Sequence, residues 1–250
     1  MNWTELLFEA VEINDVELVR EFILKGADLQ ARMNGYDILS AAVFATQKQG
    51  IDFKIIMFLL EAGASPNRES EDGETALYWA TARDEKELVR LLIEAGATVE
   101  AEQPKDGYTS LHIAAQHGNR EITEILLISG GKSALNKFDE ISMTPLMWAV
   151  EEGHLEIARM LIEAGANVNA FDELRIGNTA LRQIVDRGSY EMIELLVKAG
   201  ANPTIPGWMQ ITALDLAHKR AEEMSKKRSK EEDLKILSLL EESRKKLGEK

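Results

Sequence analysis

The side chains that carry most enzyme chemistry are few in this chain, and their spacing does not suit it. The sequence has no cysteine and four histidines, His112, His117, His154 and His218. No two of these histidines lie at a metal-ligand spacing from each other on a helix face. There is no G-x-S-x-G motif, no phosphate-binding glycine loop and no thiol nucleophile. Carboxylate pairs are abundant, but an acidic helical surface produces them by chance. The sequence therefore predicts no enzyme activity, no metal and no cofactor.

Charge and hydropathy narrow the class of protein further. The formal net charge of the 250 residues is -14. The absence of cysteine suits a reducing compartment. The first residues are acidic, with no basic side chain before Arg20, whereas a secretory signal has the opposite charge. The longest strongly apolar run, from Ile55 to Leu60, is far too short to span a bilayer. We therefore expect a cytoplasmic protein without membrane contact.

The stretch from 144 to 170 shows the unit from which the chain is built. Thr144 can cap a helix with its hydroxyl, and Pro145 suits the first helical position, where no N–H bond is lost. Gly153 supplies a left-handed turn after this short apolar helix, and a second, amphipathic helix begins near Leu155. Gly165 ends the second helix. Neither helix can bury its apolar face alone, so the unit requires neighbours.

The same features recur along almost the whole chain. The glycines that end second helices are Gly26, Gly63, Gly96, Gly130, Gly165 and Gly200. The leucines that open first helices are Leu39, Leu77, Leu111, Leu146, Leu181 and Leu214, and from Leu77 on each follows a threonine by two residues. A period of about 33–35 residues with this opening resembles the ankyrin-repeat family. The resemblance implies an all-α ankyrin-repeat solenoid of about six to seven helix-turn-helix repeats, with short hairpin loops and a helical C-terminal cap.

The resemblance also implies a division of the chain. Repeats are expected over residues 1–211, at about 1–32, 33–68, 69–101, 102–136, 137–170 and 171–204, followed by the start of a last hairpin. A degenerate last repeat and a helical cap are expected over 212–250. In the second repeat Asp37 replaces the threonine, and about five extra residues around Gln47–Ile51 are expected to lengthen the turn between the helices. These extra residues are either a functional loop or neutral drift.

The acidic charge belongs to the repeats. Residues 1–211 carry 18 basic and 34 acidic side chains, whereas residues 212–250 carry 11 basic and 9 acidic ones. The basic run from Lys226 to Lys230 suggests nucleic-acid contact or nuclear import. It is interleaved with Glu222, Glu223 and the acids at 231–233, however, which favours a solvated linker. The acidic field of the repeats also disfavours nucleic-acid binding.

By the resemblance, such arrays bind proteins through their hairpin tips and the inner side of their first helices. Transferred to this sequence, these positions give an acidic rim with apolar residues near its middle. The predicted partner-binding residues are Glu71, Asp72, Glu74, Asp106, Tyr108, His117, Glu140, Ile141, Met143, Glu151, Glu152, Ile176, Asp186, Arg187, Trp208 and Met209. Buried apolar anchors supply affinity, and surrounding charge steers association.

Three tryptophans allow two interpretations each. Trp79 and Trp148 stand at equivalent positions and predict either packing between repeats or stacking on a ligand; we favour packing. Trp208 and Met209 lie at an expected exposed tip, which predicts either partner contact or packing onto the final helix.

The sequence thus predicts a non-enzymatic module, monomeric when unbound, that binds another protein with a basic surface. It would act as an adaptor or scaffold, or as an inhibitor or immunity-type protein. The alternative is a regulatory subunit of an enzyme complex or a metabolite-binding regulator.

Overall fold

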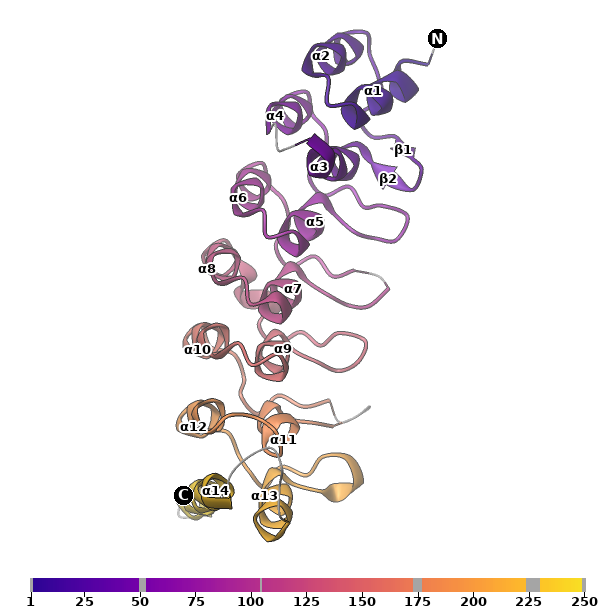
Figure 1. The fold of residues 1–250 in the computed structure, drawn as a ribbon. Coiled ribbons are helices and arrows are strands. Elements are labelled where there is room, and N and C mark those ends of the chain that lie inside the picture. Colours follow the sequence, from indigo (N-terminus) through magenta and orange to yellow (C-terminus); the bar gives the residue numbers. More distant parts are fainter. Residues whose placement is uncertain (1, 50–52, 104, 173–176, 224–229, 249–250) are drawn as a thin grey trace. The chain divides into compact units, whose positions relative to one another are not determined.

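A computed structural model describes residues 2–49, 53–103, 105–172, 177–223 and 230–248, the side chains of 46–49 and 208 excepted. The chain divides into two compact units, residues 1–110 (unit one) and 111–250 (unit two). Figure 1 shows the helices and hairpins of each. Each unit repeats a pair of antiparallel helices followed by a hairpin loop, which confirms the predicted ankyrin-repeat fold class.

Unit one contains three helix pairs. These elements are α1 (Trp3–Glu12), α2 (Val16–Leu24), β1 (Arg32–Met33), β2 (Tyr36–Asp37), α3 (Ile38–Gln49), α4 (Phe53–Glu61), α5 (Ala76–Ala82) and α6 (Lys86–Glu94). The first helices α1, α3 and α5 pack side by side, and α2 packs against α4 in a second row (Figure 1). The two short strands pair antiparallel, with Arg32 opposite Asp37 and Met33 opposite Tyr36.

Unit two continues the same alternation. Its elements are α7 (Ser110–His117, whose first residue ends unit one), α8 (Arg120–Ile128), η1 (Gly131–Ala134), α9 (Pro145–Glu151), α10 (Leu155–Glu163), α11 (Ala180–Ile184), α12 (Tyr190–Lys198), η2 (Trp208–Gln210), α13 (Ala213–Glu222) and α14 (Lys230–Gly248). The helices α9, α11 and α13 form one row, and α8, α10, α12 and α14 form the other (Figure 1).

The local signals read from the sequence produce these helix boundaries. The hydroxyl oxygen of Thr144 accepts a hydrogen bond from the Met147 N–H, 3.3 Å away, and Pro145 is the first residue of α9. The threonines before α5, α11 and α13 cap their helices in the same way. At the end of α10, Gly165 has a φ of +104°, a left-handed conformation that costs glycine little. The predicted capping residues are thereby confirmed.

Amide side chains in the loops join consecutive repeats. In unit one, the Asn67 Nδ2 donates to the Gly96 carbonyl (2.9 Å), while its Oδ1 accepts from the Thr98 N–H (2.7 Å). In unit two, Asn169 makes the same two bonds, to the Gly200 carbonyl (3.0 Å) and from the Asn202 N–H (2.7 Å). Each asparagine thus satisfies a carbonyl left free at the end of the next repeat's second helix.

The prediction of a longer inter-helix turn in the second repeat is wrong for residues 47–49. These residues extend α3, which has 12 residues where α5 and α9 have seven each. Alanine, glutamine and lysine are good helix formers, and no glycine stops the helix before position 50. Gly50 and Ile51 lie outside the described residues.

The last helix covers the end of unit two, as predicted for a cap. Ile236 and Leu240 of α14 are fully buried against α12 and α13. One acid in this region does not follow the prediction of a solvated charged stretch. Asp233 is only 2% exposed, and its Oδ1 lies 3.6 Å from the Nε of Arg220 on α13. The Lys226–Lys230 run lies outside the described residues, except for Lys230.

Asp37 caps α3 in the place where other repeats use threonine. Its Oδ1 accepts from the N–H groups of Leu39 (2.9 Å) and Ser40 (3.1 Å), and the residue is 1% exposed. Burial raises the pKa of this carboxyl above its ordinary value, although hydrogen bonds from Ser40 and Leu39 oppose the shift. Burying a carboxylate therefore costs stability at neutral pH.

Asp37→Thr should stabilise the protein at pH 7 by about 0.5–1 kcal/mol, since threonine caps the helix without a charge. The pKa of Asp37 is higher in the folded protein than in the unfolded chain, where the ordinary value is 3.8. Asp37 therefore lowers the free energy of unfolding progressively as the pH rises from 3.8 through the folded-state pKa. The gain from Asp37→Thr should therefore shrink below pH 4. Urea unfolding of both proteins at pH 3.5 and 7 measures this. A gain that is independent of pH would contradict the charge argument.

Candidate protein-binding surface

A hollow in unit two brings several of the predicted partner-binding residues together. It has a volume of about 340 Å³ and is lined by Ile141, Ser142, Met143, Trp148, Glu151, Glu152, Asn178 and Gln183. The first three residues come from the hairpin before α9, the next three from α9 and its C-cap, and the last two from the following repeat. Four of the predicted partner-binding residues, Ile141, Met143, Glu151 and Glu152, thus meet in one place.

A buried carboxylate shapes this hollow. Asp139 is 4% exposed, and its Oδ1 accepts from the N–H groups of Ile141 (3.0 Å) and Met143 (2.8 Å). Its Oδ2 accepts from the indole Nε1–H of Trp148 at 2.7 Å. One side chain therefore fixes both the hairpin and the tryptophan ring. Asp139 was not among the predicted residues, although an aspartate two and four residues before backbone N–H groups is a known turn signal.

The next hairpin is tied to the same loop. Ser142 has a φ of +66°, and its hydroxyl donates to the Asp172 Oδ2 at 2.8 Å. The preceding residue, Ile141, keeps 54% of its surface exposed, whereas Met143 and Trp148 are half-buried. The hairpin therefore presents apolar side chains at the hollow while its own polar groups are bonded.

The two glutamates of the hollow differ in their surroundings. The Glu151 carboxylate accepts from the Gln183 Nε2 and forms an ion pair with Arg187, so the predicted residue Arg187 holds it from the following repeat. The carboxylate of Glu152 is exposed and has no ion pair or hydrogen bond to any described residue. Glu152 is consequently the carboxylate of this pair that is available to a partner. Glu151 and Glu152 also line a second hollow, of about 260 Å³.

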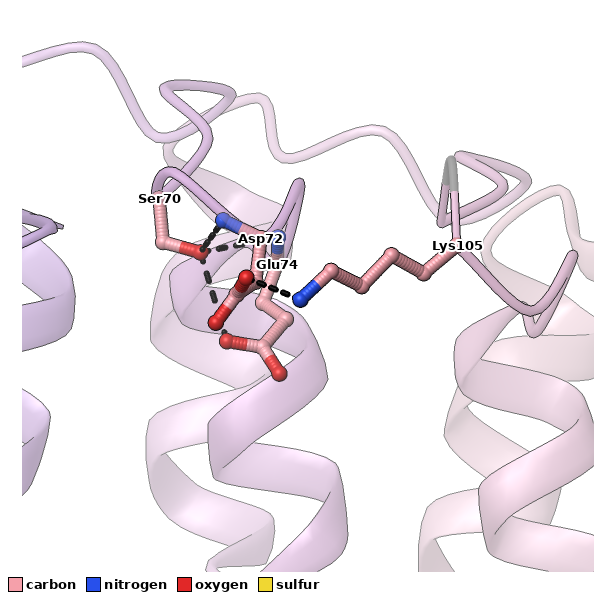
Figure 2. A network of polar contacts seen from close by, with 4 residues as sticks. All are labelled: Ser70, Asp72, Glu74 and Lys105. Atoms are coloured by element: carbon pink, nitrogen blue, oxygen red, sulfur yellow. Dashed lines mark hydrogen bonds and ion pairs between the residues drawn. The ribbon is translucent and has the colours of Figure 1, made fainter.

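In unit one, the predicted acids Asp72 and Glu74 belong to a network of polar contacts with Ser70 and Lys105 (Figure 2). The Ser70 hydroxyl donates to the Glu74 Oε2 (3.2 Å), and its oxygen accepts from the N–H groups of Asp72 and Glu74. Lys105 of the next hairpin forms an ion pair with Asp72. Burial raises the pKa of Glu74, and the nearby Asp72 adds to this. These acids therefore support the hairpins, and part of their charge is neutralised within the unit.

Among the other predicted residues, none whose side chain the structure describes lines the hollow. Asp106 accepts from the Tyr108 N–H at 3.0 Å, which turns the fourth hairpin. Exposed side chains are Glu71, His117, Glu140, Asp186 and Met209, the last 68% exposed. Ile176 and the side chain of Trp208 lie outside the described residues, so both interpretations of Trp208 stay open.

The two equivalent tryptophans have different environments. Trp79 packs on Phe44 of the preceding repeat, with ring centroids 4.6 Å apart, as expected for inter-repeat packing. The guanidinium of Arg83 lies 4.3 Å from the Phe44 centroid and 5.9 Å from that of Trp79. Tyr36 completes this aromatic cluster, 4.8 Å from Phe44. Trp148, in contrast, lines the hollow. Neither Tyr36 nor Phe44 was among the predicted residues.

The two histidines of the repeat motif are structural. The Nε2 of the fully buried His112 lies 3.1 Å from the Lys137 carbonyl oxygen, and that of His154 lies 3.0 Å from the Gln116 carbonyl oxygen. A Cβ on Gly118 would lie within 2.6 Å of the His154 ring, which explains the glycine there.

No group of three potential metal ligands occurs among the described residues. Within the same residues, no helix is long and apolar enough to cross a membrane.

Comparison with known proteins agrees with this architecture. A family profile described as "Ankyrin repeats (3 copies)" matches residues 7–103, 43–138, 99–172 and 132–207. The ankyrin repeat domain of Bcl-3, described as a unique member of the IkappaB protein family, superimposes with a TM-score of 0.76 at 26% identity, over 93% of this chain and 97% of that one. The human ASB11 ankyrin repeat domain superimposes with a TM-score of 0.70 at 24% identity, over 92% and 96%.

Relatives in sequence match over shorter stretches. Ankyrin repeat and SOCS box protein 16 of Homo sapiens is 35% identical over 102 residues, 41% of this chain and 21% of that protein. The BRCA1-associated RING domain protein 1 of Caenorhabditis elegans is 42% identical over 71 residues, 28% and 10%. This chain therefore spans about a fifth of the first relative's length and a tenth of the second's. Domains of this kind mediate protein–protein interaction. With its profile matches, its capped helix pairs and its hairpins, the chain belongs to the ankyrin-repeat family.

Proposed function

We propose that this protein binds a partner protein with a basic surface through the hollow in unit two and the rim around it. The observation that carries the proposal is that the exposed Ile141 and the half-buried Met143 and Trp148 line one hollow together with Glu152, whose carboxylate has no ion pair or hydrogen bond to a described residue. Apolar anchors within a charged rim are the usual composition of an energetically important protein contact.

The charge of the repeats supports a basic partner. Residues 1–211 have 16 more acidic than basic side chains, so the field around the hollow attracts cations. Such a field raises association rates and is screened over about 8 Å at physiological ionic strength. An adaptor and an inhibitor would both use this surface, and the choice between them depends on what the partner's covered surface does. The metabolite-binding alternative, the monomeric state and the cytoplasmic location stay predictions.

Glu152→Lys should slow association with the partner about threefold at low salt, and the difference should fall as salt is raised. Glu152 is preferred to Glu151 for this test because Glu151 also holds Arg187 and Gln183. Glu163→Lys is the matched control. It makes the same charge change at the end of α10, on an exposed residue away from the hollow.

Met143→Ala should instead speed dissociation. If Met143 is an anchor, the substitution should weaken the binding free energy by about 1–2 kcal/mol. Both sets of rates are measured by surface plasmon resonance, at 50 and 300 mM salt, on the partner recovered by cross-linking from the source cell. If both variants retain wild-type rates, the partner binds elsewhere, and the aromatic cluster of unit one, with its own hollow of about 310 Å³ beside Phe8 and Tyr36, becomes the next surface to test.

A further inference from the structure

The helices α2 and α4, which pack side by side in the second row of unit one, share an exposed apolar face (Figure 1). Leu24 of α2 keeps 82% of its surface exposed, and Met57 of α4 keeps 43%. A hollow of about 280 Å³ lies between the helices, lined by Arg20, Ile23, Leu24, Phe58, Glu61 and Ala62. Its lining residues from α4 belong to the last turn or follow it, whereas the undescribed residues 50–52 precede the first turn. We call this hollow and the exposed residues around it the outer face of unit one.

Most other repeats carry charged residues at the positions of Leu24 and Met57. Counted back from the glycine that ends each second helix, Leu24 is the second residue and Met57 the sixth. The residues at the position of Met57 in the other repeats are Arg20, Arg90, Glu124, Arg159 and Glu194. Those at the position of Leu24 are Glu61, Glu94, Ile128, Glu163 and Lys198. An exposed apolar residue adds nothing to the core where the repeat accepts a charge, so Leu24 and Met57 together indicate a surface that another molecule covers.

The outer face is electrically neutral, although unit one is acidic. Residues 1–110 carry 21 acidic and 10 basic side chains, whereas the two stretches that form the face, 16–25 and 53–62, carry three of each. A basic partner would be attracted to the acidic hairpins rather than to this face. A second copy of the chain is repelled by acidic surface and approaches most easily where the charges balance. The charge distribution therefore favours a second copy as the molecule that covers the face.

The groups of the outer face are also complementary to one another. In a contact between identical subunits about a two-fold axis, each residue of one copy meets the same residue of the other copy as its counterpart does in return, so one surface must supply both members of every pair. The outer face supplies a protruding side chain, Leu24, beside a hollow, and a base, Arg20, at the same hollow as an acid, Glu61. The Arg20 guanidinium lies 4.7 Å from the centroid of the Phe58 ring. Neither Arg20 nor Glu61 forms an ion pair with another described residue.

We propose that two copies of this chain associate through the outer face of unit one, about a two-fold axis. Leu24 of each copy enters the hollow of the other copy, and Arg20 of each copy pairs with Glu61 of the other. The contact uses none of the residues that we assign to the partner protein, so it goes beyond the proposed function. If it forms, the monomeric state predicted from the sequence is wrong.

Sedimentation velocity of the full chain, from micromolar to submillimolar concentration, measures the association. We expect a reversible equilibrium between a monomer of 27.9 kDa and a dimer of twice that mass. Leu24→Glu introduces the residue that three other repeats have at this position, and it should raise the dissociation constant of the dimer at least about tenfold. Ile128→Glu is the matched control, because it makes the same change at the same position of the fourth repeat, on a side chain that is 77% exposed. It should leave the dissociation constant unchanged, and thermal unfolding followed by circular dichroism shows that both variants fold.

Two charge reversals test the pairing of Arg20 with Glu61. Arg20→Glu and Glu61→Arg each place like charges opposite one another in the dimer, so each alone should weaken association by roughly threefold to tenfold, and by less at high salt. Mixing equal amounts of the two variants should restore association, because one copy then carries two acids at the paired positions and the other carries two bases. Both changes in one chain should restore it as well, since every acid again faces a base.

The inference is overturned by a chain that stays monomeric at every concentration, or by a dimer that Leu24→Glu leaves intact. It is also overturned if the mixed charge reversals associate no better than either variant alone. The proposed function fails separately, when the partner's kinetics are insensitive to Glu152→Lys and Met143→Ala. Because the two sets of variants change different residues, either proposal can fail while the other stands.

Discussion

Deleting residues 230–250 should destabilise unit two by several kcal/mol and make its last repeats open locally. The helix α14 buries Ile236 and Leu240 against α12 and α13, and each such side chain is worth about 2–5 kcal/mol when truncated to alanine. The deletion also removes Asp233 and leaves the mostly buried Arg220 without its counter-ion. In repeat proteins stability is approximately a sum over neighbouring repeats, so the loss should be concentrated at this end.

Hydrogen exchange followed by mass spectrometry measures the local effect. Amides of α12 and α13 should lose protection in the deletion variant, whereas those of α1–α4 should keep theirs. A point variant tests the same contact in case the truncated chain aggregates. Leu240→Ala should lower the free energy of unfolding, measured in urea, by about 2–5 kcal/mol. Leu247→Ala, on the exposed side of the same helix, should stay within about 0.5 kcal/mol. Unchanged protection of α12 and α13 would show that α14 does not stabilise them.

Asp139→Ala should lower the free energy of unfolding by about 2–4 kcal/mol and also abolish the hollow in unit two. The substitution leaves three donors without an acceptor, the N–H groups of Ile141 and Met143 and the indole N–H of Trp148. An unpaired buried donor costs about 1–3 kcal/mol, and water reaches some of these groups because the hairpin is partly exposed. Urea unfolding measures the free energy of unfolding, and the association and dissociation rates of the partner measure the effect on the site.

A double-mutant cycle isolates the bond to the tryptophan. Asp139→Asn keeps an oxygen for the two backbone N–H groups but places an amide N–H opposite the indole N–H. This single change should destabilise the protein by about 1–2 kcal/mol. Combining it with Trp148→Phe should recover part of that cost, since phenylalanine has no N–H to oppose the amide. Additive effects of the two changes would mean that the Asp139–Trp148 bond contributes nothing.

Ser70→Ala is the comparison in unit one. Ser70 stands where the fifth repeat has Asp139 and accepts from two backbone N–H groups. The Trp79 indole N–H is buried there without a hydrogen-bond partner in the described structure. Because Ser70 supports the hairpin but not the tryptophan, its loss should cost only about 1 kcal/mol.

Much of the fold could be predicted from the sequence because it depends on local interactions. A threonine hydroxyl reaches the N–H three residues later, as Thr144 does to Met147, whatever the rest of the chain does. A glycine such as Gly165 adopts its left-handed conformation within one turn of the helix that it ends. Repeated about every 33–35 residues, these local signals define the helix pairs and the family.

Two features differ from the prediction because the repeat pattern does not show which local preference prevails at a given residue. The extra residues after Thr46 were expected in a turn, but their helix propensity extends α3 to Gln49. Asp233 was counted with the solvated charges around it, but α14 places it next to Arg220 in the interior. Sequence spacing alone does not tell which of several neighbouring acids faces the core.

The sequence alone determined the family, the net negative charge of the repeats and the presence of Ile141, Met143, Glu151 and Glu152 on the predicted binding side of the fifth repeat. Only the tertiary structure decided which of these charges are available. Glu151 is held by Arg187, 36 residues later, and Glu152 is not. It also decided that the Gln183 Oε1 is buried without a hydrogen-bond partner among the described residues. The physical reason is that pairing between repeats depends on distances of a few ångströms between side chains more than 30 residues apart, and a periodic sequence places such residues in adjacent repeats without determining which atoms meet.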